Sequence, residues 1–330
     1  MGSSGAAPYA ADRVGTAVID PTGEFVAGST QSFTLTYTAG YFGIDDTGSL
    51  KIVQRFASDT GRPQFADPAA PNHVSATASN GAVLALEYDP KRNVRPWDKA
   101  LVVKVVRGFL REGDRVAIRF ANLRLQTFHE PSFEFKVLVD PFATYIFTEL
   151  PVQPTIAIVA GKPVLYKAIL PTGKRIGESF TLGFKGEDEW GNPSDRVDGT
   201  FALRASLPVD GLPATFTMRP GAYAHSVAGL SVREPGDLVI DVLDMSGQPV
   251  CRSNPLRILR DAELLPYWAD LHGQSEETIG TNSARELIVF ARDRAFLDAM
   301  SHQDTTSRSR RPSGTRSTAS PQSSIATAAS

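Results

Sequence analysis

The sequence has very little cysteine, no long apolar run and almost no net charge. Its one cysteine, Cys251, excludes a disulfide within the chain and a zinc site built on several cysteines. No stretch of about 18 consecutive apolar residues occurs, and we therefore expect no membrane-spanning helix. The formal net charge of −2 gives no electrostatic reason to expect a nucleic acid or an anionic membrane as a partner.

The N-terminus lacks a recognisable targeting signal. Residues 1–7 contain neither the basic region nor the apolar region of a secretory signal. We therefore expect a cytoplasmic protein with a flexible segment over residues 1–13, while export through a signal upstream of this sequence stays open. Hydrophobic residues make up 42% and charged residues 21% of the 330 residues, which is ordinary for soluble globular protein. This length predicts two or three domains.

Residues 14–150 carry the pattern of a β-sandwich domain. Polar and apolar residues alternate with period two in short runs such as 32–38 and 115–120, which places one face of each strand in a core. Clusters of proline, glycine, aspartate and asparagine separate these runs, as turns do. Residues 40–48 are too rich in glycine for a strand and predict a loop.

A second β-domain is predicted for residues 151–260, after a linker at 151–154. Its length and its short alternating runs match one immunoglobulin-like (Ig-like) sandwich. The segment 188–193 is typical of a tight turn, in which Gly191 supplies a left-handed backbone. Its acidic residues also allow a calcium site, although the ligand spacing of an EF-hand is absent, and both interpretations stay open.

The pattern changes over residues 261–303. An apolar run at 266–272 predicts a strand, a capping box of Ser283 and Glu286 predicts the start of a helix, and residues 296–300 predict a second strand. Strand, helix and strand in this order form a βαβ unit, which implies a parallel sheet or barrel. A β/α barrel needs roughly 250 residues, so we predict that this segment is an incomplete barrel. Because an incomplete barrel cannot close its sheet, we expect a protease to remove it while the β-domains persist.

The last segment, residues 304–330, differs in composition from the rest of the chain. It holds eight serines, five threonines and four arginines, with Ile325 as its one large aliphatic residue. Because so little apolar area is available to offset the entropy of ordering, we predict a disordered tail. RNA binding is a weaker alternative, since the segment has no aromatic residue for base stacking. We also hypothesise that residues 305–330 are an out-of-frame translation of a longer gene.

Two histidines at predicted strand ends suggest a metal site. His272 ends the first strand of the βαβ unit and His302 ends the second, so a right-handed crossover brings both to one rim. Asp270 lies two residues before His272, which in a regular strand directs both side chains to the same face. Imidazole and carboxylate are both donors to zinc, manganese or iron. Asp298 is a candidate to orient a metal-binding residue through a hydrogen bond, without binding the metal itself. A buried structural role is the alternative.

The same segment resembles the opening of the PHP (polymerase and histidinol phosphatase) domains. The resemblance lies in Tyr267-Trp-Ala-Asp-Leu-His-Gly-Gln-Ser-Glu-Glu-Thr-Ile-Gly280 and in residues 291–303. It is similar above all to a branch of that superfamily that carries β-sandwich domains in front. The resemblance implies a distorted seven-stranded β/α barrel, up to three metal ions and hydrolysis of phosphoesters. It says nothing of the substrate.

The resemblance also implies which residues would bind metal. His272 matches the first histidine of the first motif, Asp-Leu-His-x-His, and Gln274 stands where its second histidine would be. His302 matches the histidine of the second motif, with Ser301 in place of the aspartate. The implied metal set is therefore His272, His302, Asp270 and Gln274. In the intact family these residues imply a divalent metal, but here we expect none to be stably bound.

Two functions remain open on this sequence. The first is a truncated member of a metal-dependent hydrolase family, inactive by itself, with an unknown small-molecule substrate. The alternative is a non-catalytic β-sandwich protein that binds a carbohydrate or another protein through strand edges or loops. The aromatic residues Tyr41, Phe42, Trp97 and Trp190 are candidates for such contacts, although core packing explains each of them too. The catalytic residues and the oligomeric state are not readable from the sequence.

Overall fold

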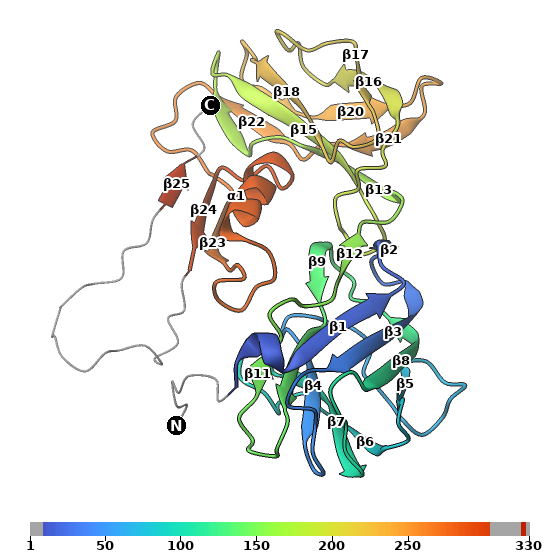
Figure 1. The fold of residues 1–330 in the computed structure, drawn as a ribbon. Helices are drawn as coiled ribbons and strands as arrows, with labels where there is room; N and C mark the ends of the chain where they lie inside the picture. The colour runs from blue at the N-terminus through green and yellow to red at the C-terminus, as the bar shows by residue number, and fades with distance from the viewer. Residues whose placement is uncertain (1–8, 304–324, 328–330) are drawn as a thin grey trace, which may run out of the picture. The chain divides into compact units, whose positions relative to one another are not determined.

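The computed structural model describes residues 9–303 and 325–327, which are mainly β-structure (Figure 1). Two short helices accompany the strands, the 3-10 helix η1 (Ala11–Arg13) and the α-helix α1 (Ala284–Asp293). No helix in this described part of the chain has the length and apolar character needed to cross a membrane. The chain divides into two compact units, residues 1–159 with 279–281, and residues 160–278 with 282–330.

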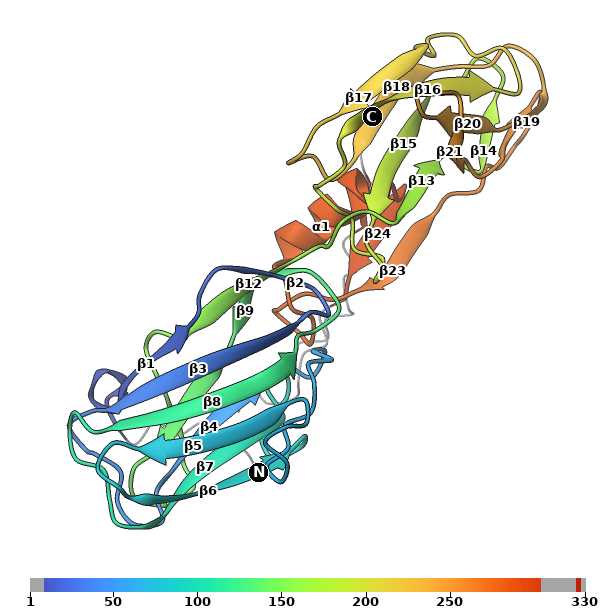
Figure 2. The ribbon, with the colours of Figure 1, turned by 90° about the vertical axis from the view of Figure 1, so that its right-hand side faces the viewer.

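The first unit is a β-sandwich. One sheet has the strand order β1-β3-β8-β5, a second has the order β11-β10-β4-β7-β6, and β2, β12 and β9 form a third, smaller sheet (Figure 2). The strands are β1 (Gly15–Asp20), β2 (Glu24–Val26), β3 (Thr30–Ala39), β4 (Ser49–Gln54), β5 (His73–Ala78), β6 (Val83–Asp89), β7 (Lys99–Arg107), β8 (Arg115–Arg124), β9 (Glu130–Glu134), β10 (Lys136–Asp140), β11 (Thr148–Glu149) and β12 (Thr155–Val159).

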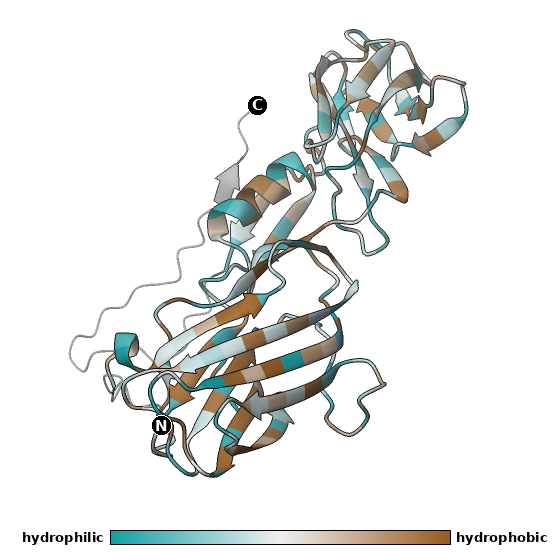
Figure 3. Ribbon diagram, turned by 45° about the vertical axis from the view of Figure 1, so that its right-hand side comes forward, coloured by the Kyte–Doolittle hydropathy of each residue, from teal (hydrophilic) through white to brown (hydrophobic). Residues whose placement is uncertain are grey.

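The core of this sandwich follows from the alternating sequence pattern. In β3, Phe33, Leu35 and Tyr37 are buried, and the threonines between them face outward. Figure 3 shows the same alternation of hydrophobic and hydrophilic residues along the long strands of this unit. Each fully buried aromatic or aliphatic side chain stabilises the fold by roughly 1.5–3 kcal/mol. The predicted sandwich is therefore confirmed, and the loop at 40–48 lies between β3 and β4 as expected.

Both ends of this unit differ from the prediction. Strand β12, predicted to begin the second domain, pairs in parallel with β2 and antiparallel with β9, so the boundary lies after Val159 and not at 150. Residues 9–13, predicted to be part of a flexible N-terminus, contain η1, and the ring of Tyr9 packs on the first core. Local composition predicted neither the pairing of β12 nor the packing of Tyr9, because both depend on residues that lie far away in the sequence.

The second unit contains a smaller Ig-like sandwich, as predicted. Its sheets have the orders β13-β15-β18, β14-β22-β19 and β17-β16-β20-β21, packed around one apolar core. The strands are β13 (Leu165–Ile169), β14 (Gly173–Arg175), β15 (Phe180–Glu187), β16 (Gly199–Ala205), β17 (Thr215–Met218), β18 (His225–Leu230), β19 (Gly236–Leu238), β20 (Ile240–Leu243), β21 (Pro249–Arg252) and β22 (Leu256–Leu259).

The predicted βαβ unit follows in the same chain segment. Strand β23 (Ala269–Gly273) pairs in parallel with β24 (Ala299–His302), and α1 connects them. The capping box is present, with the Ser283 hydroxyl accepting from the Glu286 amide and the Glu286 carboxylate accepting from the Ser283 amide. Strand β25 (Ile325–Thr327) pairs antiparallel with β24. The rest of the predicted tail, residues 304–324 and 328–330, lies outside the described residues.

The βαβ unit packs against the second sandwich. A Cβ atom added to Gly183 in β15 would lie 2.7 Å from the ring of Phe296, so that ring rests directly on the glycine. The guanidinium of Arg294 lies 3.6 Å from the ring centroid of Tyr223. The guanidinium of Arg175 donates to the carbonyl oxygen of Ala262, which fixes the chain that leads into β23. These contacts argue against our expectation that a protease readily removes this segment.

Candidate functional site

The two predicted histidines lie at the ends of neighbouring parallel strands. In the ladder between β23 and β24, Gly273 pairs with His302, and His272 directly precedes Gly273. Strands β23 and β24 run parallel, and α1 lies between them in the sequence. Their carboxyl ends therefore lie at the same end of this small sheet, and both histidines stand there. The two histidines are thus neighbours across the strand pair, and the metal-binding role of His272 and His302 stays a prediction.

Each imidazole has a different side-chain partner. The Nε2 atom of His302 lies 2.9 Å from the hydroxyl oxygen of Ser275, which is fully buried. The Nε2 atom of His272 lies 3.3 Å from the amide nitrogen Nε2 of Gln274, and His272 is exposed. The other side-chain atom of Gln274, Oε1, is buried without a hydrogen-bond partner among the described residues. Gln274 thus orients His272, whereas Ser275 orients His302.

The two predicted carboxylates bond to backbone. Asp270 accepts a hydrogen bond from the His272 amide at 2.8 Å, and the ladder shifts register between Asp270 and Gly273. This shift interrupts the strand alternation from which we predicted a shared face for Asp270 and His272. Asp298 accepts from the Trp268 amide at 2.8 Å, and its own amide donates to the Trp268 carbonyl. Both carboxylates therefore fix local backbone.

These residues do not amount to a complete metal centre. Among the residues that the structure describes, no group of three or more histidine, cysteine, aspartate or glutamate side chains is placed to hold a metal ion. Two imidazoles with separate partners and a neutral amide are fewer and weaker donors than a stable zinc or manganese site needs. We derive no catalytic step from this end of the sheet.

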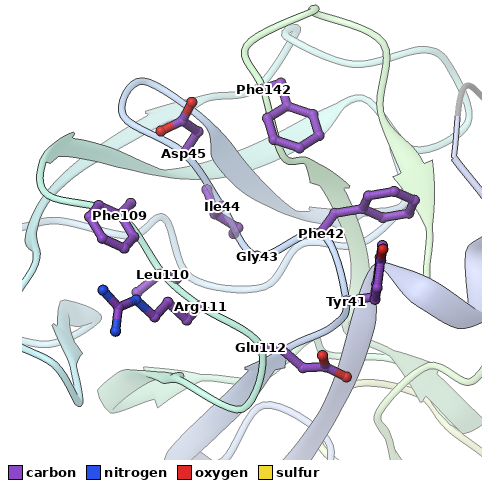
Figure 4. Close-up of a pocket in the computed structure, with 10 residues that line it drawn as sticks. All are labelled: Tyr41, Phe42, Gly43, Ile44, Asp45, Phe109, Leu110, Arg111, Glu112 and Phe142. Carbon is purple, nitrogen blue, oxygen red and sulfur yellow. The ribbon is translucent and has the colours of Figure 1, made fainter.

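A different site lies at one end of the first sandwich, where three loops meet (Figure 4). The loops join β3 to β4, β7 to β8 and β10 to β11, and between them is an open cleft of about 350 Å³. We call it the aromatic cleft. Its lining includes Tyr41, Phe42, Asp45, Phe109, Arg111, Glu112 and Phe142.

Aromatic rings dominate the lining of the aromatic cleft. Tyr41, Phe109 and Phe142 are 59%, 47% and 45% exposed, so large rings from three loops lie open to solvent at one place. Phe42 lies between its neighbours, with its ring centroid 5.3 Å from that of Tyr41 and 6.4 Å from that of Phe142. The ring centroid of Tyr9 lies 5.2 Å from that of Phe42 and 5.7 Å from that of Phe142. Tyr9, Tyr41, Phe42 and Phe142 thus form one cluster of ring contacts, and Phe109 lies apart from it on a different loop (Figure 4).

Backbone hydrogen bonds make the floor of the aromatic cleft rigid. Ile44 and Leu110, from two different loops, are buried and exchange amide-to-carbonyl hydrogen bonds of 2.9 and 2.7 Å. Gly43 lies beside them with φ of 63°, and a Cβ atom at this position would lie 2.1 Å from the Leu110 carbonyl oxygen. Only glycine therefore permits this close approach of the two loops.

The third loop carries further exposed apolar side chains. Asp140, almost fully buried, accepts hydrogen bonds from the amide and hydroxyl of Thr144 and from the amide of Tyr145. Tyr145 and Ile146 are 86% and 51% exposed. Ala143 and Tyr145 both have positive φ, 55° and 64°, a conformation that costs energy for residues other than glycine. A strained but fixed loop therefore presents these side chains to solvent.

The aromatic residues singled out in the sequence do not lie together. Tyr41 and Phe42 line the aromatic cleft, but Trp97 packs on a separate small apolar cluster, and the side-chain cations of Arg55 and Lys136 each lie 4.8 Å from its ring. Trp190 belongs to the second unit. Sequence reasoning missed Phe109 and Phe142. Each adjoins a turn residue, as in Gly108-Phe109 and Pro141-Phe142, and an apolar ring beside a turn is the signal that marks them.

The turn at 188–193 is held by its own aspartate. The buried carboxylate of Asp188 accepts from the amides of Trp190, Asn192 and Gly161, each at 2.9 Å, and from the Asn192 side chain. Hydrogen-bond donors therefore surround both oxygens, where a calcium site would need oxygen ligands around a cation. This geometry favours the structural turn over the calcium site.

No protein-family model matches the sequence, and no curated protein matches it. Similar solved structures include the Yersinia pseudotuberculosis adhesin InvE, with 13% identity and a TM-score of 0.23. Another is a Corynebacterium diphtheriae protein described as membrane-anchored, with 11% identity and a TM-score of 0.22. The matches cover 74% and 76% of this chain but 58% and 55% of those chains, so this chain spans less than two thirds of either. At these TM-scores the likeness carries no argument about function.

Proposed function

We propose that this chain is a non-catalytic β-sandwich binding protein and that the aromatic cleft is its binding surface. One observation carries the proposal. Exposed rings of Tyr41, Phe109 and Phe142, from three separate loops, converge on one end of the first sandwich. Sandwich domains commonly bind through loops gathered at one end, because the sheets hold the loops rigidly while the loop sequences vary.

The physical properties of the aromatic cleft suit binding. Aromatic side chains contribute large contact areas and lose little conformational entropy, since each has two side-chain torsions. The bonds between Ile44 and Leu110 and the ring cluster around Phe42 fix the surface before a ligand arrives. Preorganisation of this kind lowers the entropy lost on association.

The test is a selection on the full chain with a displayed peptide library and, in parallel, a glycan array. We expect ligands that bind the native chain and lose binding to the double variant Phe109→Ser/Phe142→Ser. Met245→Ser is the matched control, because Met245 is also an exposed apolar residue but lies in the second unit. If the selected ligands bind the native chain and the double variant equally, the aromatic cleft is not the binding surface.

A second candidate function is favoured by the βαβ unit. The proposal is that β23, α1 and β24 are the opening of a PHP-type metal-dependent hydrolase domain. Its support is the placement of His272 and His302 at the carboxyl ends of parallel neighbours. The donor set described above argues against stable metal binding by this chain, so we rank this candidate second.

Metal content separates the two candidates. The full chain, purified without chelator, is analysed for zinc, manganese and iron beside His272→Ala and His302→Ala. His225→Ala is the control, since His225 stacks on Phe216 in the second sandwich and belongs to neither candidate site. We expect well under one metal ion per chain in all four samples. Stoichiometric metal that both His272→Ala and His302→Ala abolish would make the hydrolase candidate the better one.

A further inference from the structure

We infer that the aromatic cleft accepts a lysine or arginine side chain from a partner protein. This inference rests on the proposed function and names the chemistry of the ligand. It follows from three properties of the cleft: the ring faces that it offers, the carboxylates that border it and the apolar loop beside it.

The rings of the aromatic cleft already bind cations from within the chain. The guanidinium carbon of Arg13 lies 3.8 Å from the ring centroid of Tyr41, and that of Arg111 lies 5.2 Å from the ring centroid of Phe109. A cation over the face of an aromatic ring is attracted by the negative potential of that face. No cation of the described residues covers Phe142, although that ring is nearly half exposed. The rings of Tyr9 and Phe42 pack against Phe142 at centroid distances of 5.7 and 6.4 Å, and the exposed part of its ring is the place for a cation from outside.

Two carboxylates border the aromatic cleft. Among the described residues, the carboxylate of Asp45 accepts one hydrogen bond, from the amide of Asp46 at 2.8 Å. Glu112 is exposed, and its carboxylate has no ion-pair partner among the residues that the structure describes. Figure 4 shows Asp45 and Phe142 on the same side of the opening and Glu112 across it. Arg111 is already placed over Phe109 and Arg13 over Tyr41, so the net charge around the opening is close to zero. The carboxylate of Asp45, on the same side as Phe142, has no ion-pair partner among the described residues and complements an incoming basic group there.

The surroundings of the aromatic cleft indicate a protein as the source of that group. Tyr145 and Ile146 are exposed on the loop that carries Phe142, and Asp140 holds this loop. A protein segment places apolar side chains next to its basic one and thus covers both features, whereas a free cation or a sugar covers only one. Tyrosine and arginine side chains are enriched among the residues that contribute most of the binding energy near the centre of a protein interface.

The experiment compares two synthetic pentapeptides that differ only in charge. One has the sequence Ser-Ile-Arg-Ile-Ser with blocked ends, and the other has citrulline, the uncharged analogue of arginine, at its centre. Amide resonances of the isotope-labelled full chain are followed during titration with each peptide. We expect the arginine peptide to shift the amides of Asp45 and Phe142, with a Kd about tenfold below that of the citrulline peptide.

Substitutions in the chain test the carboxylates. The double variant Asp45→Asn/Glu112→Gln keeps the shape of both side chains, and it should weaken the arginine peptide about tenfold while leaving the citrulline peptide unchanged. Asp46→Asn is the control, because Asp46 is an exposed neighbour outside the lining and should have no effect.

Three outcomes would overturn the inference: equal binding of the two peptides, no effect of the double variant, or no shift with either peptide. Titration with cellohexaose separates this failure from failure of the proposed function. If the sugar shifts the same amides and the peptides do not, the cleft is a binding site for a different ligand. If no ligand from the library or the array depends on Phe109 and Phe142, the proposed function itself fails.

Discussion

The carboxylate of Asp140 accepts a hydrogen bond from the Tyr145 amide across 2.6 Å, from a position at the end of β10 that is almost fully buried. The same carboxylate also accepts from the amide and the hydroxyl of Thr144. One side chain thus holds a loop in which Ala143 and Tyr145 take left-handed conformations. This carboxylate therefore supports the exposed apolar surface beside the aromatic cleft, together with the bonds between Thr144 and Ile146.

Replacement of Asp140 by alanine should release the loop. The backbone amides of Thr144 and Tyr145 lose their acceptor, and we expect the free energy of unfolding of the first unit to fall by about 2–3 kcal/mol. Hydrogen exchange should accelerate at residues 141–147 more than in the sheets. Asp140→Asn keeps one acceptor oxygen and should give an intermediate effect. Unchanged exchange in this loop in Asp140→Ala would mean that other contacts hold it.

Substitution of Asp188 separates two roles for its carboxylate, that of a structural acceptor in the turn and that of a calcium ligand. Because that buried carboxylate accepts from three backbone amides, Asp188→Ala should lower the free energy of unfolding of the second unit by about 2–4 kcal/mol. Glu189→Ala, an exposed acid in the same turn, is the control and should have almost no effect. Thermal unfolding with millimolar calcium or with a chelator should be the same. A rise in Tm with calcium that Asp188→Ala abolishes would restore the calcium site.

The sequence contained the local features of this fold. Alternation predicted the strands, because the side-chain period of a strand is a backbone property. The pair Ser283 and Glu286 predicted the start of α1, since both hydrogen bonds of a capping box lie within one turn. The order of strand, helix and strand predicted the parallel pairing that brings His272 and His302 to one end.

Features that depend on distant pairings were missed. The assignment of β12 to the first unit depends on β2, at the opposite end of that unit's sequence. The aromatic cleft forms because hydrogen bonds between Ile44 and Leu110 join two loops. The hydrophobic periodicity of the sequence does not indicate which loops become neighbours. The metal hypothesis relied on regular alternation through Asp270, and a register shift interrupts it there. Alternation predicts which face a residue occupies but not which residues lie across from it.

The contact of Phe296 with Gly183 predicts how the βαβ unit responds to protease. Gly183 lies in β15 without a positive φ, so valine is compatible with its backbone, but its side chain would occupy the position of the Phe296 ring. We expect the native chain to resist cleavage between residues 261 and 303 and Gly183→Val to be cleaved there several-fold faster. Thr181→Val, at an exposed position of the same strand, should behave like the native chain. Rapid cleavage of the native chain in this segment would show that the packing is weak.

The single thiol of the chain predicts a loss of stability in alkali. Burial raises the pKa of the Cys251 thiol from 9.0 to about 11, because the thiolate is poorly solvated beside the second core. Above pH 9 the unfolded chain releases this proton while the folded chain retains it, so the stabilisation present below pH 9 is lost as the pH rises to about 11.

The difference amounts to at most about 3 kcal/mol, and we expect less because Cys251 is only partly buried. Serine does not titrate in this range, so Cys251→Ser should lose less stability than the native chain between pH 9 and 11. Urea unfolding of the second unit, followed by hydrogen exchange in β20 and β21, measures both proteins at each pH. Parallel pH profiles for the two would show that the thiol titrates alike in the folded and unfolded chains.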